Sequence, residues 1–265
     1  MKIATLNINS INARLPLLTT WLAQQQPDIV LLQEIKTEFN NFPFWDLQMA
    51  GYEAKIVGQK SYNGVAVLSR TSLSVNSENL PNFIDENARY LEVETTIKDI
   101  PYTFSSIYLP NGNPSKSAPL DNSRFEYKLK WMDAFVAHAE TLLKSGKNVM
   151  LAGDFNVMLT PKDVYNPELF ANSPLYCSEV WKRLNKLIYL GYNDSFRSLH
   201  PLENGYTYWD YGTTAFQNDL GLRIDYIFSS PNMTDKLIDC SVDKKLRALE
   251  KSSDHTVLIA NFKDE

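Results

Sequence analysis

Five short motifs place acidic or amide side chains where apolar, strand-like runs begin or end. They are spread over the whole chain: LNIN (residues 6–9), LLQEIK (31–36), GDFN (153–156), GLRIDYIF (221–228) and SDH (253–255). A fold that aims several carboxylates at one point must overcome their mutual repulsion. A bound divalent cation is the usual means, so the pattern predicts a metal site with oxygen ligands.

Two of the motifs carry their acid at the end of a wholly apolar run. Glu34 and Asp154 both stand there, and a carboxylate in that place suits a hard cation such as Mg²⁺. Taken alone, Glu34 reads as a surface glutamate, whereas together with the other acids it reads as a ligand. Asp154 and Asn156 lie two residues apart, so extended backbone would point both side chains the same way. The alternative is an Asx turn, which Asp and Asn favour after strands.

The SDH motif offers a histidine that is suited to phosphate chemistry. His255 follows Asp254, and Asp225 is a candidate carboxylate partner for it. Such a partner raises the pKa of an imidazole and orients it, and a cationic imidazole stabilises charge that develops on a phosphate. The alternative is a packed histidine without chemistry. His138 fits that description inside an amphipathic helix, and His200 reads as loop surface.

The elements that must position these motifs repeat one order. A strand, a helix and a buried strand are expected at residues 2–9, 12–25 and 29–32, with Asn12 as the helix cap. A second amphipathic helix and buried strand are expected at residues 124–143 and 148–152, separated by Gly146. Each buried strand therefore leads into an acid, Glu34 in one case and Asp154 in the other.

The remaining segments add strands and one more helix. Strands are expected at residues 52–57, 64–69, 90–97, 102–108, 224–228, 237–242 and 256–262, and a helix at 178–190. Loops rich in proline and asparagine, residues 110–119 and 165–174, belong on the surface. Many strands in layers with helices outside predict an α/β (α+β) sandwich. Because motifs near both termini serve one site, residues 1–265 are expected to form a single domain.

Composition excludes several classes of protein. The chain has 265 residues, a formal net charge of -5 and a pI near 5.3, so bulk charge does not mark it as a nucleic-acid binder. Cys177 and Cys240 lack the spacing of a zinc site and are expected to be free, buried thiols. Neither a secretory signal nor a membrane span is recognisable, which predicts a cytoplasmic protein without membrane contact.

With YLPNG (residues 108–112) added, the six motifs in this order and spacing resemble bacterial exonuclease III. These enzymes are the class II apurinic/apyrimidinic endonucleases of the endonuclease/exonuclease/phosphatase superfamily. The resemblance runs from residue 2 to residue 262, and six motifs in order are specific although none is decisive alone. It implies a four-layered sandwich with two mixed sheets packed face to face and helices on the outside.

The resemblance implies roles for the acids and amides. Asn7, Glu34 and Asp254 match metal-site positions, Glu34 being the main ligand for Mg²⁺, with Mn²⁺ as an alternative. Asp154 matches the residue that orients or deprotonates the attacking water, and Asn156 lies beside it.

Five further positions match residues on the phosphate side of the family's site. His255 matches the histidine that contacts the scissile phosphate, and Asp225 matches the carboxylate paired with it. Tyr108, which alone would read as a core residue, matches a tyrosine that assists the transition state. Asn111 matches a phosphate-side amide, and Lys36 matches a basic residue that contacts DNA.

Substrate choice within the superfamily depends on other segments. SYNGVAVLSR (61–70), GLRIDYIF and the aromatic TYWDY (207–211) resemble the DNA-repair branch. The pocket for a baseless sugar is expected to be lined by Tyr208, Trp209, Leu222 and Ile224. Ordinary strand packing is the alternative for this aromatic run. Candidate contacts to the DNA backbone are Arg70, Arg89, Arg124 and Arg223, each of which also fits a plain surface residue.

One departure from the family concerns intercalation. Gly212 stands where relatives often carry a bulky side chain that wedges into the duplex.

The expected function is a Mg²⁺-dependent DNA-repair phosphodiesterase that acts as a monomer on double-stranded DNA. It would incise 5′ to abasic sites, remove 3′ blocking groups and digest duplex DNA from 3′ to 5′, leaving a 3′-hydroxyl and a 5′-phosphate. The alternatives are a phosphatase or phosphodiesterase acting on a lipid or small-molecule phosphate, because one fold serves many substrates, and a non-catalytic nucleic-acid-binding relative.

Overall fold

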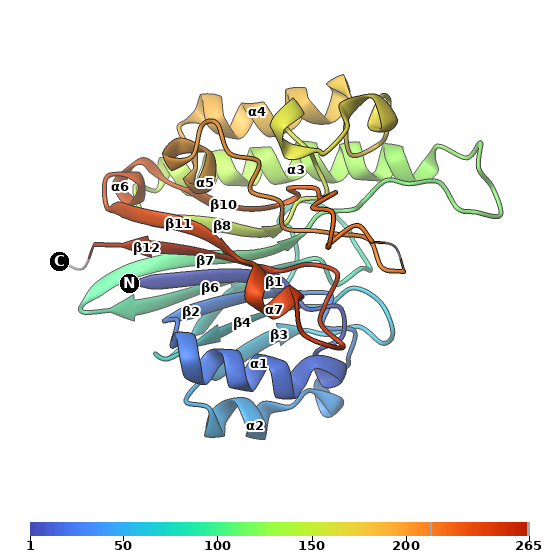
Figure 1. Ribbon diagram of the computed structural model, residues 1–265. Helices are drawn as coiled ribbons and strands as arrows, with labels where there is room; N and C mark the ends of the chain where they lie inside the picture. The colour runs from blue at the N-terminus through green and yellow to red at the C-terminus, as the bar shows by residue number, and fades with distance from the viewer. Residues whose placement is uncertain (213, 264–265) are drawn as a thin grey trace.

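In the computed structural model, which describes residues 1–212 and 214–263, two six-stranded sheets pack face to face (Figure 1). The first sheet has the order β11 (Leu237–Asp243), β12 (Val257–Phe262), β1 (Lys2–Asn7), β2 (Ile29–Gln33), β4 (Val65–Ser69), β3 (Glu53–Val57). The second has the order β5 (Ser74–Ser77), β6 (Tyr90–Ile97), β7 (Ile100–Tyr108), β8 (Asn148–Asp154), β10 (Asp225–Ser229), β9 (Asn193–Asp194).

Helices cover the outer face of each sheet. α1 (Ile11–Gln25) and α2 (Phe44–Met49) lie on the first sheet, and α3 (Ser123–Lys144) and α4 (Ser178–Leu190) lie on the second (Figure 1). The short helices are α5 (Ser195–Leu199), α6 (Pro231–Thr234) and α7 (Lys244–Arg247), with 3₁₀ turns at Phe39–Asn41, Pro161–Asp163 and Pro167–Phe170. The four-layered α/β sandwich predicted from the sequence is confirmed. No helix in the described part of the chain is both long enough and apolar enough to cross a membrane.

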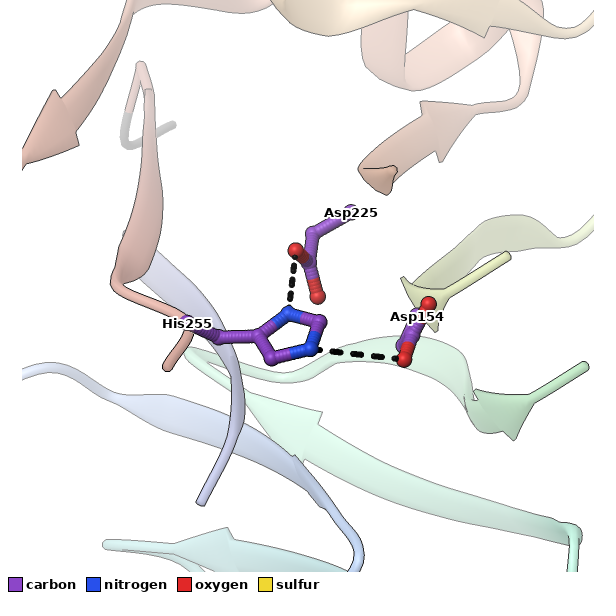
Figure 2. Close-up of side chains that lie close together, drawn as sticks. All are labelled: Asp154, Asp225 and His255. Atoms are coloured by element: carbon purple, nitrogen blue, oxygen red, sulfur yellow. Dashed lines mark hydrogen bonds and ion pairs between the residues drawn. The ribbon is translucent and has the colours of Figure 1, made fainter. Parts of the chain in front are cut away.

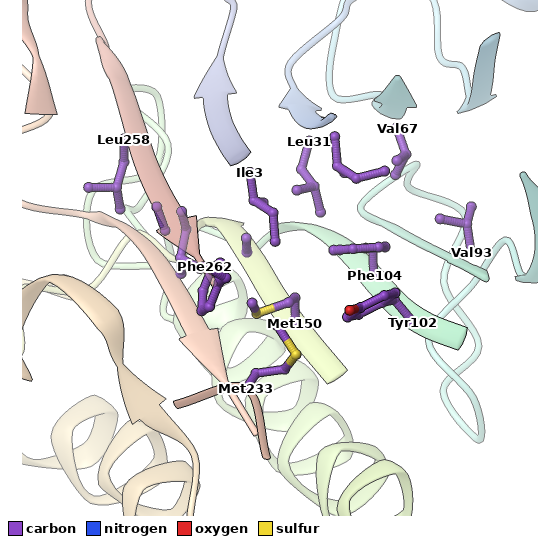
Figure 3. Packing of buried hydrophobic residues seen from close by; sticks show 14 of the residues in the cluster. Ile3, Leu31, Val67, Val93, Tyr102, Phe104, Met150, Met233, Leu258 and Phe262 are labelled. Atoms are coloured by element: carbon purple, nitrogen blue, oxygen red, sulfur yellow. The ribbon is translucent and has the colours of Figure 1, made fainter. Parts of the chain in front are cut away.

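Alternating side chains of the buried strands supply three apolar cores. In β2, Ile29 and Leu31 contact the core between the sheets, while Val30 and Leu32 join the core beneath α1 and α2. The strand period of two sends successive side chains to opposite faces, so a wholly apolar strand serves two layers. Figure 3 shows the core between the sheets, where Ile3, Leu31 and Val67 face Phe104 and Met150. This packing holds the two sheets in one fixed relation.

Two strand–helix–strand units determine at which edge of each sheet their strands end. β1, α1 and β2 form one unit, in which the strands pair in parallel, and β7, α3 and β8 form the other. In both units the strands therefore end at the same edge of their sheet. That edge carries Glu34 and Asp154, as expected from the repeated order of elements.

Most predicted elements occur within a residue or two of their expected bounds, and the differences have local causes. α1 begins one residue earlier than expected, and its cap position is Ser10, not Asn12. The Asn12 amide donates to Thr37 Oγ1 and to the Asn41 carbonyl, so tertiary contacts use it instead. β5 and β9 were missed because β5 is a polar, largely exposed edge strand and β9 has two residues.

The structure corrects one prediction about the cysteines and one about the histidines. Both cysteines are free, but only Cys240 is buried, while Cys177 is partly exposed. His138 is packed as expected, with Nε2 2.7 Å from Glu92 Oε2. His200 is not loop surface: it is half-buried at the end of α5, and its Nε2 lies 2.9 Å from the Cys240 carbonyl oxygen.

Gly153 permits the close approach of β7 and β8 beside Asp154. Its φ is +152°, and a Cβ at this position would lie 1.9 Å from the Ile107 carbonyl oxygen. We expect Gly153→Ala to lower the free energy of unfolding by more than about 2 kcal/mol, because backbone atoms must move to admit the methyl group. Urea unfolding measures this loss.

Gly146→Ala is the matched control for this substitution. Gly146 has a φ of +70°, but a Cβ there would meet nothing within 4 Å. Only the conformational cost of about 1 kcal/mol is expected. Equal losses for the two variants would contradict the steric explanation.

Candidate active site

The ends of two parallel strand pairs bring the predicted acids together. β1 and β2 end side by side, at Asn7 and just before Glu34, and β7 and β8 end at Tyr108 and Asp154. Asp225, the first residue of β10, pairs with Asp154 in an antiparallel register. Residues from both sheets therefore meet at one edge of the sandwich.

One amide group connects the two sheets at this edge. Asn7 Nδ2 donates to Glu34 Oε1 at 2.8 Å and to Asp154 Oδ2 at 2.9 Å. Asn7 Oδ1 accepts from the backbone N–H of Asn9 at 3.2 Å. The amide nitrogen thus faces both carboxylates while its oxygen is engaged by backbone. Asn7 thus contacts both acids, and the metal-ligand role that the resemblance implies for it stays a prediction.

Glu34 is held in its carboxylate form. Burial alone would raise its pKa, but the hydrogen bond from Asn7 and the ammonium of Lys36 lower it below the ordinary value. Lys36 Nζ lies 2.7 Å from Glu34 Oε2 and 2.6 Å from Asn9 Oδ1. The Lys36 ammonium therefore pairs with Glu34, and the DNA contact that the resemblance implies for it stays a prediction.

Left-handed backbone at the strand ends aims these side chains. Glu34 has a φ of +49°, Lys36 of +52° and Asn156 of +48°. Such angles cost roughly 1 kcal/mol each for residues other than glycine and are typical of functional sites. The Asn156 N–H donates to Asp154 Oδ1 at 2.9 Å, which is the Asx turn. The extended arrangement of Asp154 and Asn156 was therefore wrong, and the Asn156 amide donates to the Leu109 carbonyl instead.

His255 is paired with Asp225, as predicted. Its Nδ1 lies 2.8 Å from Asp225 Oδ2, and its Nε2 lies 3.7 Å from Asp154 Oδ2 (Figure 2). Burial alone would lower the pKa of His255, but Asp225, and next Asp154, raise it to about 10. The imidazole is therefore a cation at neutral pH, held between two carboxylates.

Asp154 has a strongly raised pKa. Burial raises its pKa to about 7, and the charges of Asp225 and Glu34 add to this, while His255 and Asn7 oppose it. A carboxyl with a pKa near neutrality can accept a proton from water and release it again. Asp154 is thus suited to act as a general base.

Tyr108 lies against the same acids. The side chain is buried, and the pKa of its phenol is raised first by burial and then by the charges of Glu34 and Asp154. The Arg89 guanidinium lies 4.8 Å from the centre of its ring, and Arg89 Nη1 donates to the Tyr108 carbonyl. The phenol therefore stays protonated and remains a hydrogen-bond donor at the site. Arg89 supports Tyr108 and is not a plain surface residue.

A cleft of about 560 Å³ opens above these residues. Its polar side is lined by Glu34, Tyr108, Asn111, Asn113, Asp154, Asn156, Asp210, Asp254 and His255. Its apolar side is lined mainly by Tyr165, Phe170, Leu175, Tyr208, Ala215, Leu220, Leu222 and Ile224. One cleft thus combines acidic, proton-handling side chains with a group of apolar side chains, which we term the apolar wall.

The acids of the cleft fit a divalent cation. Four carboxylates, those of Glu34, Asp154, Asp225 and Asp254, lie in or beside the cleft, whereas the ion pairs at the site involve two cations, Lys36 and His255. Ligand atoms of Asp154, Asp225 and His255 lie within 4.8 Å of one another. Glu34 and Asp254 also line the cleft, and their role as ligands of a hard cation stays a prediction.

Two residues predicted to contact DNA are interior instead. Trp209 is fully buried and donates from Nε1 to Asp219 Oδ1, so the aromatic run contributes Tyr208 to the cleft but not Trp209. Arg223 is also fully buried, with Nε 2.7 Å from Asp163 Oδ1 and Nη1 2.8 Å from Asp194 Oδ2. Its neighbours in sequence, Leu222 and Ile224, line the cleft, as was expected for both.

The other predicted contacts differ in their distance from the cleft. Arg70 follows β4 at the end that pairs with Ile29, which is the edge of the sheet opposite Glu34, so it is remote from the site. Arg124 is exposed in the first turn of α3, after the loop that carries Asn111. Gly212 is exposed with a φ of +72° and open space around it.

Most of the apolar wall was missed from the sequence. Tyr165 and Phe170 come from the segment that was expected to be a surface loop, Leu175 directly follows that segment, and Ala215 and Leu220 follow the TYWDY run. The signal that was available was the apolar content of residues 164–176, which is high for a solvated loop.

The chain matches known proteins over nearly its full length. The Endonuclease/Exonuclease/phosphatase family profile matches residues 4–255. Exodeoxyribonuclease III of Haemophilus influenzae is 27% identical, with 99% of this chain and 100% of the relative covered.

Two solved structures are also similar. An AP endonuclease from Archaeoglobus fulgidus has 32% identity and a TM-score of 0.91, with 100% of both chains covered. The 3′ phosphatase NExo from Neisseria, bound to a product DNA hairpin, has 36% identity and a TM-score of 0.89, with 99% of both chains covered.

The buried ion pairs of Asp163 generate a prediction for acid stability. Burial raises the pKa of Asp163, but Arg223 and Arg197 lower it below its ordinary value of 3.8. A carboxyl with a depressed pKa stabilises the fold above its unfolded-state pKa, and this contribution is lost as pH falls through the folded-state pKa. We expect Asp163→Asn to reduce the free energy of unfolding at pH 7 by about 2–4 kcal/mol. The gap to wild type should shrink as pH falls below about 4.

Urea unfolding at a series of pH values checks this, with Asp133→Asn as control. Asp133 pairs with Arg183 on the surface, with about half of its side chain exposed (48%). A gap for Asp163→Asn that stays constant from pH 7 to pH 3, or that matches the control, would contradict the assignment.

Proposed function

Because the chain belongs to the endonuclease/exonuclease/phosphatase family, we propose that it is a Mg²⁺-dependent DNA-repair phosphodiesterase. It incises DNA 5′ to abasic sites, removes 3′ blocking groups and digests duplex DNA from the 3′ end. The observation that carries this proposal is the cleft itself. A general base with a pKa near 7, Asp154, and an imidazolium, His255, lie beside an apolar wall in one cleft.

The metal and the phosphate are held on the polar side of the cleft. Glu34 and Asp254 would hold the cation, and bound Mg²⁺ would supply positive charge that stabilises the negative charge of the transition state. Asp254 is itself oriented by Asn9, whose Nδ2 donates to Asp254 Oδ1 at 3.0 Å. Asn111 and Asn156, which also line the cleft, contact the phosphate group of the substrate.

Hydrolysis follows from the protonation states. Asp154 accepts a proton from the water that attacks phosphorus, the bond from phosphorus to the 3′-oxygen breaks, and the released 3′-oxygen takes a proton from solvent water. The His255 imidazolium, kept charged by Asp225, stabilises the negative charge on the phosphoryl oxygens. The Tyr108 phenol donates to the same group. The products are a 3′-hydroxyl and a 5′-phosphate, and no covalent intermediate is needed.

The apolar wall favours a damaged sugar. An abasic deoxyribose has no base to unstack, so rotating it into an apolar pocket costs little. Tyr208 also lines the cleft, and the centre of its ring lies 5.0 Å from the centre of the His255 ring. Support for DNA as the partner comes from the solved relative bound to a DNA hairpin and from the relative named as an AP endonuclease.

We also propose that residues 1–265 form one catalytic domain, which acts as a cytoplasmic monomer. β1 and β12, which come from the two ends of the chain, pair with each other and both lead to the cleft. One chain thus contributes every residue to which a role is given.

Asp154→Asn tests the base. We expect its kcat on a duplex with one abasic analogue to fall by roughly 10³-fold or more, because the amide cannot take the proton. Gel-resolved cleavage in Mg²⁺ and in chelator gives the rates. Asp235→Asn, an exposed change after α6, is the control and should retain wild-type turnover. Unchanged turnover of Asp154→Asn would remove Asp154 from the mechanism.

The same assay separates the alternatives when the substrate is varied. A recessed 3′-hydroxyl duplex, a 3′-phosphate duplex, an inositol phosphate and a phosphoinositide vesicle are compared with the abasic duplex. Hydrolysis of the inositol phosphate or of the lipid alone would support a phosphatase outside DNA repair. Hydrolysis of none of the five would support a binding protein.

Glu34→Gln tests the metal site without relying on turnover. We expect Mg²⁺ to raise the melting temperature of the wild type, since a ligand that binds only the folded state stabilises it. In Glu34→Gln the Mg²⁺-induced shift should be largely lost. Glu53→Gln, a partly exposed glutamate paired with Lys55 on β3, is the control. An equal shift in all three proteins would place the cation elsewhere.

A further inference from the structure

Lys128 is a buried cation that the proposed mechanism does not use. It lies on α3, its side chain is fully buried, and no carboxylate within residues 1–212 and 214–263 forms an ion pair with it. Burying an ammonium without a counter-ion is costly unless each of its protons finds an acceptor. Burial lowers the pKa of Lys128 to about 7, while Cys177 and Asp154 oppose the shift. A position this unfavourable calls for a specific reason.

All three N–H groups of Lys128 donate to backbone carbonyls. Nζ lies 3.1 Å from the oxygen of Asn111, 2.7 Å from that of Asn156 and 2.8 Å from that of Pro174. An ammonium has three donors, so its hydrogen-bonding capacity is filled. The acceptors are 17, 28 and 46 residues away in the sequence. One side chain therefore joins three segments that are distant along the chain.

Each of these segments forms part of the cleft. Asn111, in the loop after β7, and Asn156, in the turn after β8, both line its polar side. Pro174 stands between Ser173 and Leu175, which also line it. The carbonyls that Lys128 binds thus belong to three segments that line the cleft, whereas Lys128 itself is not among the lining residues.

The loop after β7 is shaped around the Lys128 stem. Gly112 has a φ of +79°, and a Cβ there would lie 2.8 Å from Lys128 Cδ. A residue other than glycine would push the loop off the stem. The Asn156 amide also donates to the Leu109 carbonyl at 2.9 Å, so two of the three segments are joined to each other as well.

We propose that Lys128 is a positioning residue that holds the Asn111, Asn156 and Pro174 segments at the spacing that the phosphodiesterase reaction requires. It acts through Asn111 and Asn156 and does not touch the substrate. The inference rests on the proposed function for its catalytic part, whereas its structural part can be measured without substrate.

Lys128→Met tests this, because Met keeps an unbranched stem and removes the three donors. We expect amide hydrogen exchange to accelerate at least tenfold in residues 109–113, 155–158 and 173–176, and not in the strands of the first sheet. On the abasic duplex kcat should fall by roughly 10–100-fold with a smaller change in KM, since misplacement of about 1 Å can cost that much. Lys130→Met, an exposed lysine two residues along α3, should match the wild type in both measurements.

Lys128→Arg is the conservative variant, because it retains a charged donor group. Partial recovery of protection in the same three segments, relative to Lys128→Met, supports the proposal. If Lys128→Met does not fold, Lys128→Arg is compared with wild type directly. If neither variant folds, Lys128 serves global stability and the proposal is overturned. Exchange and kcat in Lys128→Met equal to those of Lys130→Met also overturn it.

A failure of the proposed function remains distinguishable from a failure of this inference. If the wild type cleaves none of the DNA substrates, the proposed function fails, and hydrogen exchange alone decides whether Lys128 holds the three segments. If the wild type cleaves DNA and exchange rises in Lys128→Met without any loss of kcat, the positioning role in catalysis is overturned.

Discussion

The amide of Asn7, which donates to Glu34 and Asp154 across two sheets, is the contact on which the site depends. Like charges repel strongly in a buried cleft, so carboxylates can gather there only if donors or cations face them. Asn7 supplies two donors, Lys36 neutralises Glu34, and His255 lies between Asp225 and Asp154. Burial, together with the charges of Asp225 and Glu34, raises the pKa of Asp154 to about 7, and the excess of carboxylates over cations fits a hard cation.

The sandwich makes this arrangement possible because it contains two parallel units. Each unit ends its two strands at one edge, and the apolar core between the sheets aligns the two edges. Gly153 lets β7 and β8 approach closely next to Asp154, and left-handed backbone at Glu34 ends β2 abruptly. Unfavourable backbone angles and crowded charges thus lie at the rim, while the apolar cores supply the stability that tolerates them.

Buried cations support the walls of the cleft from behind. Arg223 binds Asp163 and Asp194 between two cleft-lining residues, and Lys128 binds three carbonyls of three loops. Buried charges add little net stability, but they require a fixed geometry because every donor must keep its acceptor. Loops held in this way can carry functional groups with a precision that surface loops lack.

The sequence by itself determined the family, the layered fold and the principal acids. Six motifs in order resembled exonuclease III, and this resemblance is confirmed by the matched family and by the relatives named exodeoxyribonuclease III and AP endonuclease. Apolar periodicity located α4 and most strands, because each strand must present side chains to two cores. Only the tertiary structure decided that Arg223 and Trp209 are interior, that Arg70 is remote and that Lys128 lies behind the cleft. Whether a charged or aromatic side chain faces water or a buried partner depends on segments that are distant in the chain. The residues next to it in the sequence do not show which segments these are.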